Sequence, residues 1–129
     1  MILTGEQIQY TARSTAGELL GVSSGRPFVD KLEVYKVAGK VFLIVTDDPG
    51  EPIVTVKCEP GHARALQRQH ASIMPGRYLN KAHWISVGPG RGITRDLVAD
   101  LVEQSYELVL DTVPHRGRPG RTLHETPGS

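Results

Sequence analysis

The order of hydrophobic and polar positions along the chain predicts three helices and four strands, in the order α-β-β-β-α-β-α. In the predicted helices apolar residues recur every three or four positions, whereas the predicted strands are rich in β-branched and aromatic residues. The elements are expected at 5–20 (helix), 32–37, 40–46 and 53–57 (strands), from Pro60 to before Pro75 (helix), 83–87 (strand) and between Thr94 and Pro114 (helix). Short turns join the first three strands. This favours an α+β fold with an antiparallel sheet of about four or more strands and helices packed on one side.

Local sequence signals mark where several of these elements begin and end. Thr4 and Gln7 fit a capping box at the start of the first helix, and Gly21 is expected to end that helix. The segment 21–30, rich in Ser and Gly, is interpreted as a loop, and Ala38-Gly39 as a hairpin turn. The strand after this turn is apolar at almost every position, so we expect it to lie centrally with both faces covered.

Length and composition are those of one soluble globular domain. The chain has 129 residues, of which 39% are hydrophobic and 22% charged, and we assign one domain to residues 1–113. The remaining residues, 114–129, contain too few apolar groups to pack and are expected to form a disordered tail.

The sequence predicts a cytoplasmic protein. No apolar run approaches the roughly 18 residues of a membrane span, and the first residues lack the pattern of a secretory signal. Cys58 is the only cysteine, so an internal disulfide is excluded, which fits a reducing compartment. We expect a monomer with no membrane association, no cofactor and no metal.

Charge is distributed unevenly along the chain. Residues 57–95 carry seven Lys or Arg against one carboxylate, Glu59, a net charge of +6 with the histidines neutral. Residues 96–111 carry five carboxylates and no Lys or Arg. Two interpretations stay open. The segments form solvated faces of opposite sign that could pair with each other, or the basic segment forms a surface that meets a polyanion such as DNA.

Several stretches of the sequence together resemble a known family. They are GRPFVDKLEVYKVAGKVFLIV, VTVKCEP, PGRYLNKAHWISV and SYELV, and their most specific parts are Lys57-Cys58, Pro75-Gly76, Leu79-Asn80-Lys81 and His83-Trp84-Ile85. Over about residues 4–112 the chain resembles the MmcQ/YjbR family of small bacterial proteins. The resemblance implies a CyaY-like α+β fold, similar to a double-wing DNA-binding motif, and DNA binding by fold-level analogy. One departure is Glu59, which stands where an aspartate N-cap is usual and should weaken that cap.

The basic middle segment supplies the candidate nucleic-acid-binding residues. They are Lys57, Arg64, Arg68, Arg77, Tyr78, Asn80, Lys81, His83 and Trp84. The lysines and arginines would contact phosphates, Asn80 and Arg77 could read base edges, and Tyr78 or Trp84 could stack on an unpaired base. The alternatives are structural. Asn80 suits a turn, Trp84 suits a core, and His83 alternates with apolar positions and could point inward.

The sequence contains no catalytic constellation that would predict an enzyme. Cys58 could act as a nucleophile with His62 or His83 as base, but a buried thiol at a strand end is the simpler interpretation. The acidic residues from Asp96 to Glu107 could bind iron, as in frataxin-like proteins, only if several oxygens converged on one point. The favoured function is weak nucleic-acid binding through a basic patch. The alternative is an adapter that binds a protein or small ligand between sheet and loop.

Overall fold

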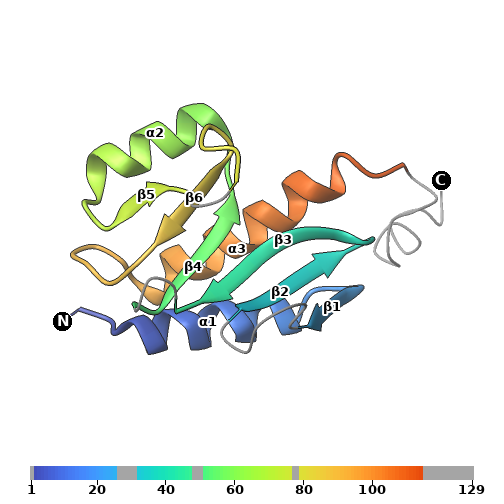
Figure 1. Ribbon diagram of the computed structural model, residues 1–129, viewed down its shortest axis with the longest axis horizontal. Helices are drawn as coiled ribbons and strands as arrows, with labels where there is room; N and C mark the ends of the chain where they lie inside the picture. Colours follow the sequence, from blue (N-terminus) through green and yellow to red (C-terminus); the bar gives the residue numbers. More distant parts are fainter. Residues whose placement is uncertain (1, 26–31, 48–50, 77–78, 115–129) are drawn as a thin grey trace.

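The protein is an α+β fold built on one six-stranded antiparallel sheet (Figure 1). The computed structural model describes residues 2–25, 32–47, 51–76 and 79–114. Within these residues lie α1 (Gly5–Gly17), β1 (Val22–Gly25), β2 (Leu32–Val37), β3 (Lys40–Thr46), β4 (Ile53–Lys57), α2 (Pro60–Gln69), β5 (Ile73–Pro75), β6 (Trp84–Val87) and α3 (Arg95–Leu110). The predicted α+β class and antiparallel sheet are confirmed. Most of the predicted tail, residues 115–129, lies outside the described residues.

The strands follow the order β1-β2-β3-β4-β6-β5 across the sheet. The first four form a meander, and the chain then passes through α2 and β5 before β6 pairs with β4. The helices α1 and α3 pack side by side on one face of the sheet, while α2 lies at the β5 end (Figure 1). Among the described helices, none has both the length and the apolar character needed to cross a bilayer.

The hydrophobic core fills the space between the sheet and the two packed helices. One cross-strand row of this core contains Tyr35, Leu43, Val56 and Ile85, which the register places opposite one another on β2, β3, β4 and β6. The helix α3 contributes Val98, Leu101, Val102, Tyr106, Val109 and Leu110. These buried side chains hold both helices against one face of the sheet, and we call the opposite face the open face.

The strand β3 lies centrally, as predicted, but only one of its faces is fully covered. Leu43 and Val45 belong to the core and are buried. Ile44 and Thr46 alternate with them, so they lie on the open face, where they are partly exposed. The prediction that both faces are covered was therefore wrong, and the open face carries accessible apolar side chains.

Two short strands, β1 and β5, were not predicted from the sequence. β1 falls within the segment that was interpreted as a loop. Its sequence VSSG lacks apolar alternation, and its pairing with β2, in which Val22 lies opposite Val37, identifies it as a strand. β5 has only three residues and ends at Pro75, which is tolerated because this strand lies at an edge of the sheet.

Helix capping agrees with the sequence signals. Thr4 Oγ1 accepts the Gln7 N–H at 3.0 Å, and Gln7 Oε1 accepts the Thr4 N–H at 2.9 Å, which completes the predicted capping box. At the start of α3, Thr94 Oγ1 accepts the Leu97 N–H at 3.1 Å. Glu59 makes no side-chain bond to the start of α2, in agreement with the weaker cap expected for glutamate at this position.

The first helix ends at Gly17, about three residues before the predicted end. The residues that follow form a turn, and the Tyr106 hydroxyl donates a hydrogen bond to the Leu20 carbonyl at 2.6 Å. Gly21 does not end the helix. Its φ of 74° allows the chain to turn into β1, a conformation that residues with a side chain rarely adopt.

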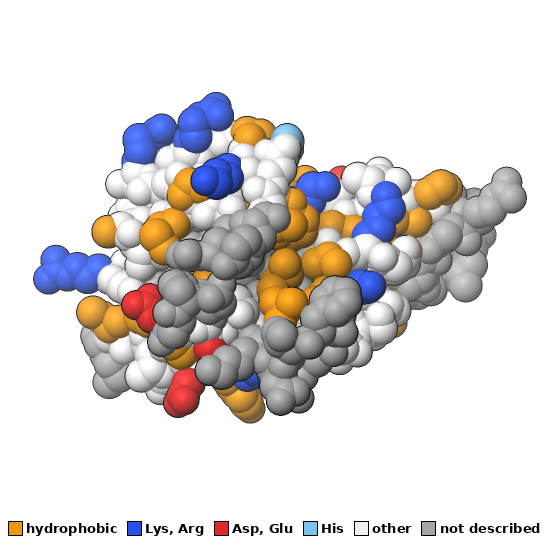
Figure 2. All heavy atoms as spheres, viewed as in Figure 1, with side chains coloured by type: hydrophobic (Ala, Val, Ile, Leu, Met, Phe, Trp, Pro, Cys, Tyr) orange, Lys and Arg blue, Asp and Glu red, His pale blue; other side chains and the backbone are white. Residues whose placement is uncertain are grey.

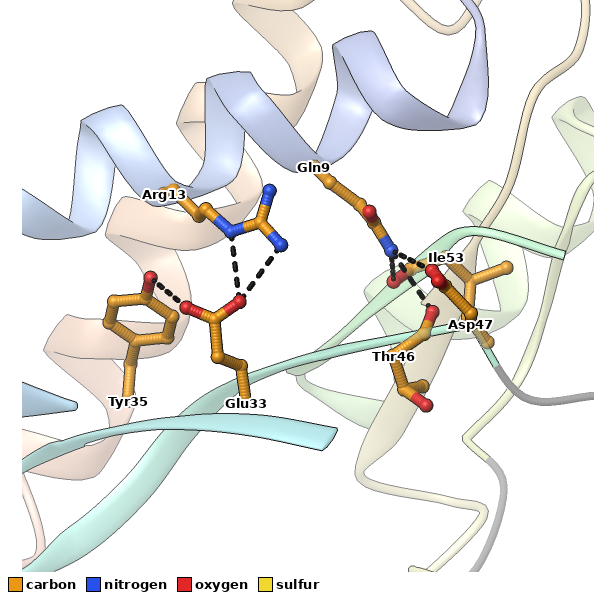
Figure 3. Close-up of polar contacts among 7 residues, drawn as sticks. All are labelled: Gln9, Arg13, Glu33, Tyr35, Thr46, Asp47 and Ile53. Carbon is orange, nitrogen blue, oxygen red and sulfur yellow. Dashed lines mark hydrogen bonds and ion pairs between the residues drawn. The ribbon is translucent and has the colours of Figure 1, made fainter. Parts of the chain in front are cut away.

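A buried glutamine of α1, Gln9, forms hydrogen bonds to the ends of β3 and β4 (Figure 3). Its Nε2 donates to the carbonyls of Thr46 at 3.0 Å and Ile53 at 3.2 Å, and to Asp47 Oδ1 at 3.1 Å. These acceptors lie on both sides of the turn. A single side chain of α1 therefore holds the two strand ends together.

A second polar contact joins α1 to β2 (Figure 3). Arg13 Nη2 lies 2.8 Å from Glu33 Oε1, and Arg13 Nε donates to the same oxygen at 3.0 Å. The Tyr35 hydroxyl donates to the other carboxylate oxygen at 3.0 Å. Because Glu33 is mostly buried, these bonds satisfy a charge that would otherwise be costly on this side of the sheet.

The β2–β3 turn places a residue with a side chain in the left-handed region. Ala38 has φ 53° and Gly39 has φ 78°, the positive values of a type I′ hairpin turn. Ala38→Asn is expected to raise the free energy of unfolding by about 0.5–1 kcal/mol, because asparagine tolerates this conformation better than alanine. Urea denaturation measures the change. An unchanged or lower stability would show that the turn is not strained at this position.

Candidate nucleic-acid interface

A lysine and the chain's only tryptophan lie opposite each other at the end of the β4–β6 pair. The register pairs Lys57 with Trp84, directly after the buried pair Val56 and Ile85. Directly opposite residues of antiparallel strands project from the same face, and successive residues alternate. Lys57 and Trp84 therefore lie on the open face, and both are partly exposed. Trp84 was also considered as a core residue; it is only partly buried and is not among the buried residues of the core.

The turn before β6 is held by hydrogen bonds of its own backbone and of Asn80. Asn80 Oδ1 accepts the Ala82 N–H at 2.9 Å, and the Asn80 carbonyl accepts the His83 N–H at 3.1 Å. The His83 carbonyl in turn accepts the Cys58 N–H at 2.7 Å. Asn80 thus uses its side-chain oxygen to form the turn, as the structural alternative predicted. The turn displays Lys81 and His83, which are exposed.

A close contact between Gly76, just after β5, and Trp84 positions the start of the loop that leads to β6. The Gly76 N–H donates to the Trp84 carbonyl at 2.7 Å, and a Cβ at Gly76 would lie 2.6 Å from Trp84 Cβ. No real Cβ tolerates such a contact, so this approach requires glycine. Arg77 and Tyr78, which follow directly, lie outside the described residues.

The hydroxyl of Ser105 on α3 fixes the end of β4 next to Lys57. It accepts the Lys57 N–H at 2.9 Å and donates to the Phe42 carbonyl on β3 at 2.6 Å. The direct β3–β4 register ends one residue earlier, at the pair Leu43 and Val56. Beyond it the two strands diverge (Figure 1), and the buried hydroxyl bridges them in place of a direct backbone bond.

The remaining candidate cations belong to α2. Arg64 and Arg68 are exposed and lie one turn apart, on the side opposite to the buried Ala63 and Leu66. The predicted site therefore has two parts. The first, which we call the Lys57–Trp84 end, consists of Lys57, Lys81, His83 and Trp84, and the second is the outer side of α2.

The face of the molecule seen in Figure 2 carries most of its Lys and Arg side chains over α2 and over the sheet, beside a group of exposed hydrophobic side chains. Most of the few Asp and Glu side chains visible on this face lie at the lower left. Among the described residues the only ion pair joins Arg13 and Glu33. The alternative in which the basic segment pairs with the carboxylates of α3 is therefore wrong for Lys57, Arg64 and Lys81.

Cys58 is a buried residue at the end of β4 and is poorly suited to be a nucleophile. It is 3% exposed, and its Sγ lies 3.6 Å from His62 Nδ1. Burial, with a smaller effect of the Glu59 carboxylate, raises the pKa of the Cys58 thiol to about 11. The thiol is thus neutral near pH 7, whereas the thiolate is the reactive form. Within the described residues, no three His, Cys, Asp or Glu are grouped so that they could hold a metal ion.

The raised pKa of the Cys58 thiol predicts a pH dependence of stability. Above about pH 9 the unfolded chain loses the thiol proton while the folded protein keeps it, so the free energy of unfolding should fall as the pH rises towards 11. Burial also raises the pKa of Tyr35, which acts in the same direction. Urea denaturation between about pH 8 and 10.5 should show a shallower decline for Cys58→Ala. Equal slopes for the wild type and for Cys58→Ala would contradict a raised pKa of the Cys58 thiol.

The fold and the Lys57–Trp84 end define a small α+β protein with a basic, partly apolar sheet face. The YjbR family model matches residues 17–108, and the chain belongs to the YjbR family, as the sequence motifs indicated. It is 36% identical over 119 residues to YbdF of Escherichia coli O157:H7, and the aligned region covers 89% of this chain and 98% of that protein. It is 30% identical over 111 residues to YjbR of Escherichia coli strain K12, with coverage of 81% and 94%.

Two crystal structures are similar to this fold. Protein DR2400 of Deinococcus radiodurans matches with a TM-score of 0.74 and 26% identity, over 88% of this chain and 84% of that one. A protein from Pseudomonas syringae matches with a TM-score of 0.64 and 21% identity, over 74% of this chain and 92% of that one. Both likenesses support the sheet and helix arrangement described above.

Proposed function

We propose that the protein binds nucleic acid weakly, mainly through charge, at the Lys57–Trp84 end of its open face. In this arrangement Lys57 and Lys81 contact phosphates, and an unpaired base stacks on the exposed part of Trp84. Stacking on an aromatic side chain beside a basic groove is a common mode of single-strand binding that does not depend on sequence. The exposed Arg64 and Arg68 of α2 extend the attraction to neighbouring phosphates.

One observation carries the proposal: Lys57 lies directly opposite a partly exposed Trp84 on the sheet face that no described helix covers. Neither Lys57 nor Lys81 forms an ion pair within the described part of the chain, so both charges are available to a polyanion. The exposed part of Trp84 leaves indole surface available to an unpaired base.

Fluorescence titration with short single- and double-stranded DNA at several salt concentrations tests the proposal. The logarithm of the affinity should fall linearly with the logarithm of salt, by about 0.7 per phosphate contacted on a single strand and 0.9 on duplex. Trp84 is the only tryptophan, so stacking of a base should quench the intrinsic fluorescence of the protein. Quenching should be larger with single strands than with duplex.

Charge-neutralising variants locate the interface. Lys57→Gln and Lys81→Gln should each reduce the salt slope by about 0.7 on single strands, because each removes one phosphate contact. Arg95→Gln is the matched control, since it removes one positive charge from the start of α3, where Arg95 contacts Thr11. Equal effects of all three variants would indicate only a response to net charge. No binding even at low salt would contradict the proposal and favour the adapter alternative.

A further inference from the structure

Lys36, on β2, lies on the open face at the same end of the sheet as Lys57 and Trp84. It stands between Tyr35 and Val37, which are both buried in the core on the side of the helices. Because successive residues of a strand alternate between the faces, the Lys36 side chain projects to the open face, and it is exposed. The basic segment seen in the sequence begins only at Lys57, so sequence analysis did not single out Lys36.

A β-bulge in β3 places an apolar residue, Val41, directly opposite Lys36. The register shifts between Tyr35 and Lys36, and Phe42 is the extra residue of β3. Phe42 and Leu43 are therefore both buried in the core, whereas Val41 is partly exposed on the open face. A bulge changes the face to which the next side chains project, and here it sets an apolar group beside the lysine.

One row of side chains thus crosses four strands of the open face at this end of the sheet. It consists of Lys36 on β2, Val41 on β3, Lys57 on β4 and Trp84 on β6. The row lies directly beyond the buried core row of the same four strands. We call it the transverse row. It has a lysine at one end, a lysine beside a tryptophan at the other, and an apolar residue between them.

The described strands carry lysines on the open face and no carboxylate there. Glu33 is the only Asp or Glu in the six strands, and it points to the opposite face, where it pairs with Arg13 of α1. Neither Lys36 nor Lys57 forms an ion pair within the described part of the chain. The transverse row therefore continues the positive charge of the Lys57–Trp84 end across the sheet and suits a polyanion.

The length and composition of the transverse row fit a single strand better than a duplex. Trp84 and Lys36 are separated by three inter-strand spacings of about 4.8 Å, at least about 14 Å in all. A stacked strand rises about 3.4 Å per nucleotide, so roughly four nucleotides cover this span. An unpaired base can contact the apolar Val41 between the lysines, whereas the bases of a duplex are paired in its interior.

We propose that a single-stranded nucleic acid lies across the sheet along the transverse row, with Lys36 as a further phosphate-binding residue on the β2 side. A base stacks on Trp84, the strand crosses β4 and β3, and a phosphate about four nucleotides away meets Lys36. This path rests on the nucleic-acid binding proposed above. It adds the class of partner, the direction of the strand across the sheet and a contact residue outside the basic middle segment.

Lys36→Gln and Lys40→Gln form a matched pair of variants that test the path. Lys40 lies opposite the buried Val37, so it projects to the helix face, where its Nζ lies 3.2 Å from Thr112 Oγ1. Both variants remove one positive charge from the same hairpin, but only Lys36→Gln removes it from the transverse row. Binding of a single strand of about eight nucleotides is followed by the quenching of Trp84 fluorescence at several salt concentrations. Lys36→Gln should reduce the salt slope by about 0.7, and Lys40→Gln should leave it unchanged.

The length of the strand gives an independent measurement. In isotope-labelled full-length protein, the longer strand should shift the amide signals of Lys36 and Val41 together with the Trp84 indole signal. A dinucleotide is too short to reach from Trp84 to Lys36, so at saturation it should shift the indole signal and leave those two amide signals in place. Equal shifts of Lys36 with both ligands would overturn the path, and so would an equally large effect of Lys36→Gln on duplex binding.

The outcomes separate this path from the proposed function on which it rests. If the strand binds the wild type and quenches Trp84, but Lys36→Gln and Lys40→Gln change the salt slope equally, the path is overturned while binding at the Lys57–Trp84 end stands. If the folded wild type neither binds the strand nor shows quenching at low salt, both proposals are overturned.

Discussion

Ser105→Ala is expected to lower the free energy of unfolding by about 2–4 kcal/mol, because two backbone groups, one of them in a buried bond, lose their partner at once. The Ser105 hydroxyl accepts the Lys57 N–H at 2.9 Å and donates to the Phe42 carbonyl at 2.6 Å. Ser105 is completely buried, so water cannot easily replace the hydroxyl. Urea denaturation with a two-state fit measures the change.

The same substitution should also weaken nucleic-acid binding under conditions in which the protein is still folded. Lys57 would lose the bond that fixes its backbone at the end of β4, so its side chain would be less well positioned beside Trp84. Ser14→Ala is the matched control, since Ser14 is exposed on α1. A loss of less than about 0.5 kcal/mol, the size expected for a surface substitution, would show that the Ser105 bridge is unimportant.

Gly76→Ala is the second substitution with a large expected effect, a loss of about 2–3 kcal/mol of stability through overpacking. The added Cβ would lie 2.6 Å from Trp84 Cβ and 3.0 Å from the Trp84 carbonyl carbon. Backbone rather than a flexible side-chain end must therefore move. The bond from the Gly76 N–H to the Trp84 carbonyl, 2.7 Å long, would lengthen as a result.

Thermal unfolding followed by the fluorescence of Trp84 reports both the stability and the surroundings of this residue. Gly61→Ala is a suitable comparison, because a Cβ there meets nothing within 4 Å. It should be neutral or slightly stabilising, as alanine is the better helix former. If Gly76→Ala unfolded at the same temperature as the wild type, the close approach would not be needed for the loop.

The elements with strong periodic patterns could be predicted from the sequence, and those that depend on pairing could not. β2, β3 and β4 follow from apolar, β-rich runs and agree with the predicted bounds. β1 was missed because VSSG has a polar pattern that forms a strand only beside β2. β5 was missed because three residues at a sheet edge are too few for a periodic signal.

The geometry of the candidate site was less accessible to sequence analysis. Asn80 was expected in a turn and forms one, because an Asx turn is a local structure. The pairing of Lys57 with Trp84 joins strands that are separated by α2 and β5, so no local pattern could reveal it. An inward orientation of His83 was one of the alternatives drawn from its alternation with apolar residues. It is exposed because β6 begins only at Trp84, and the alternation of a strand does not extend into the turn.

The role of Ser105 also depends on contacts between residues that are far apart in the chain, which local patterns do not reveal. A serine in an apolar helical stripe gives no sign that its hydroxyl bridges two strands. Its partners, Phe42 and Lys57, lie 63 and 48 residues away in the chain. Only the tertiary packing of α3 against the diverging ends of β3 and β4 creates this contact.

The most direct test of the central claim is a map of where nucleic acid contacts the folded protein. Isotope-labelled full-length protein is titrated at low salt with a short single-stranded DNA, and the backbone amide and Trp84 indole signals are followed. We predict the largest shifts at Lys57, at residues 81–84 and at the Trp84 indole, and little change in α3 between Asp100 and Asp111. Shifts centred on α3, or spread evenly around the molecule, would contradict binding at the Lys57–Trp84 end.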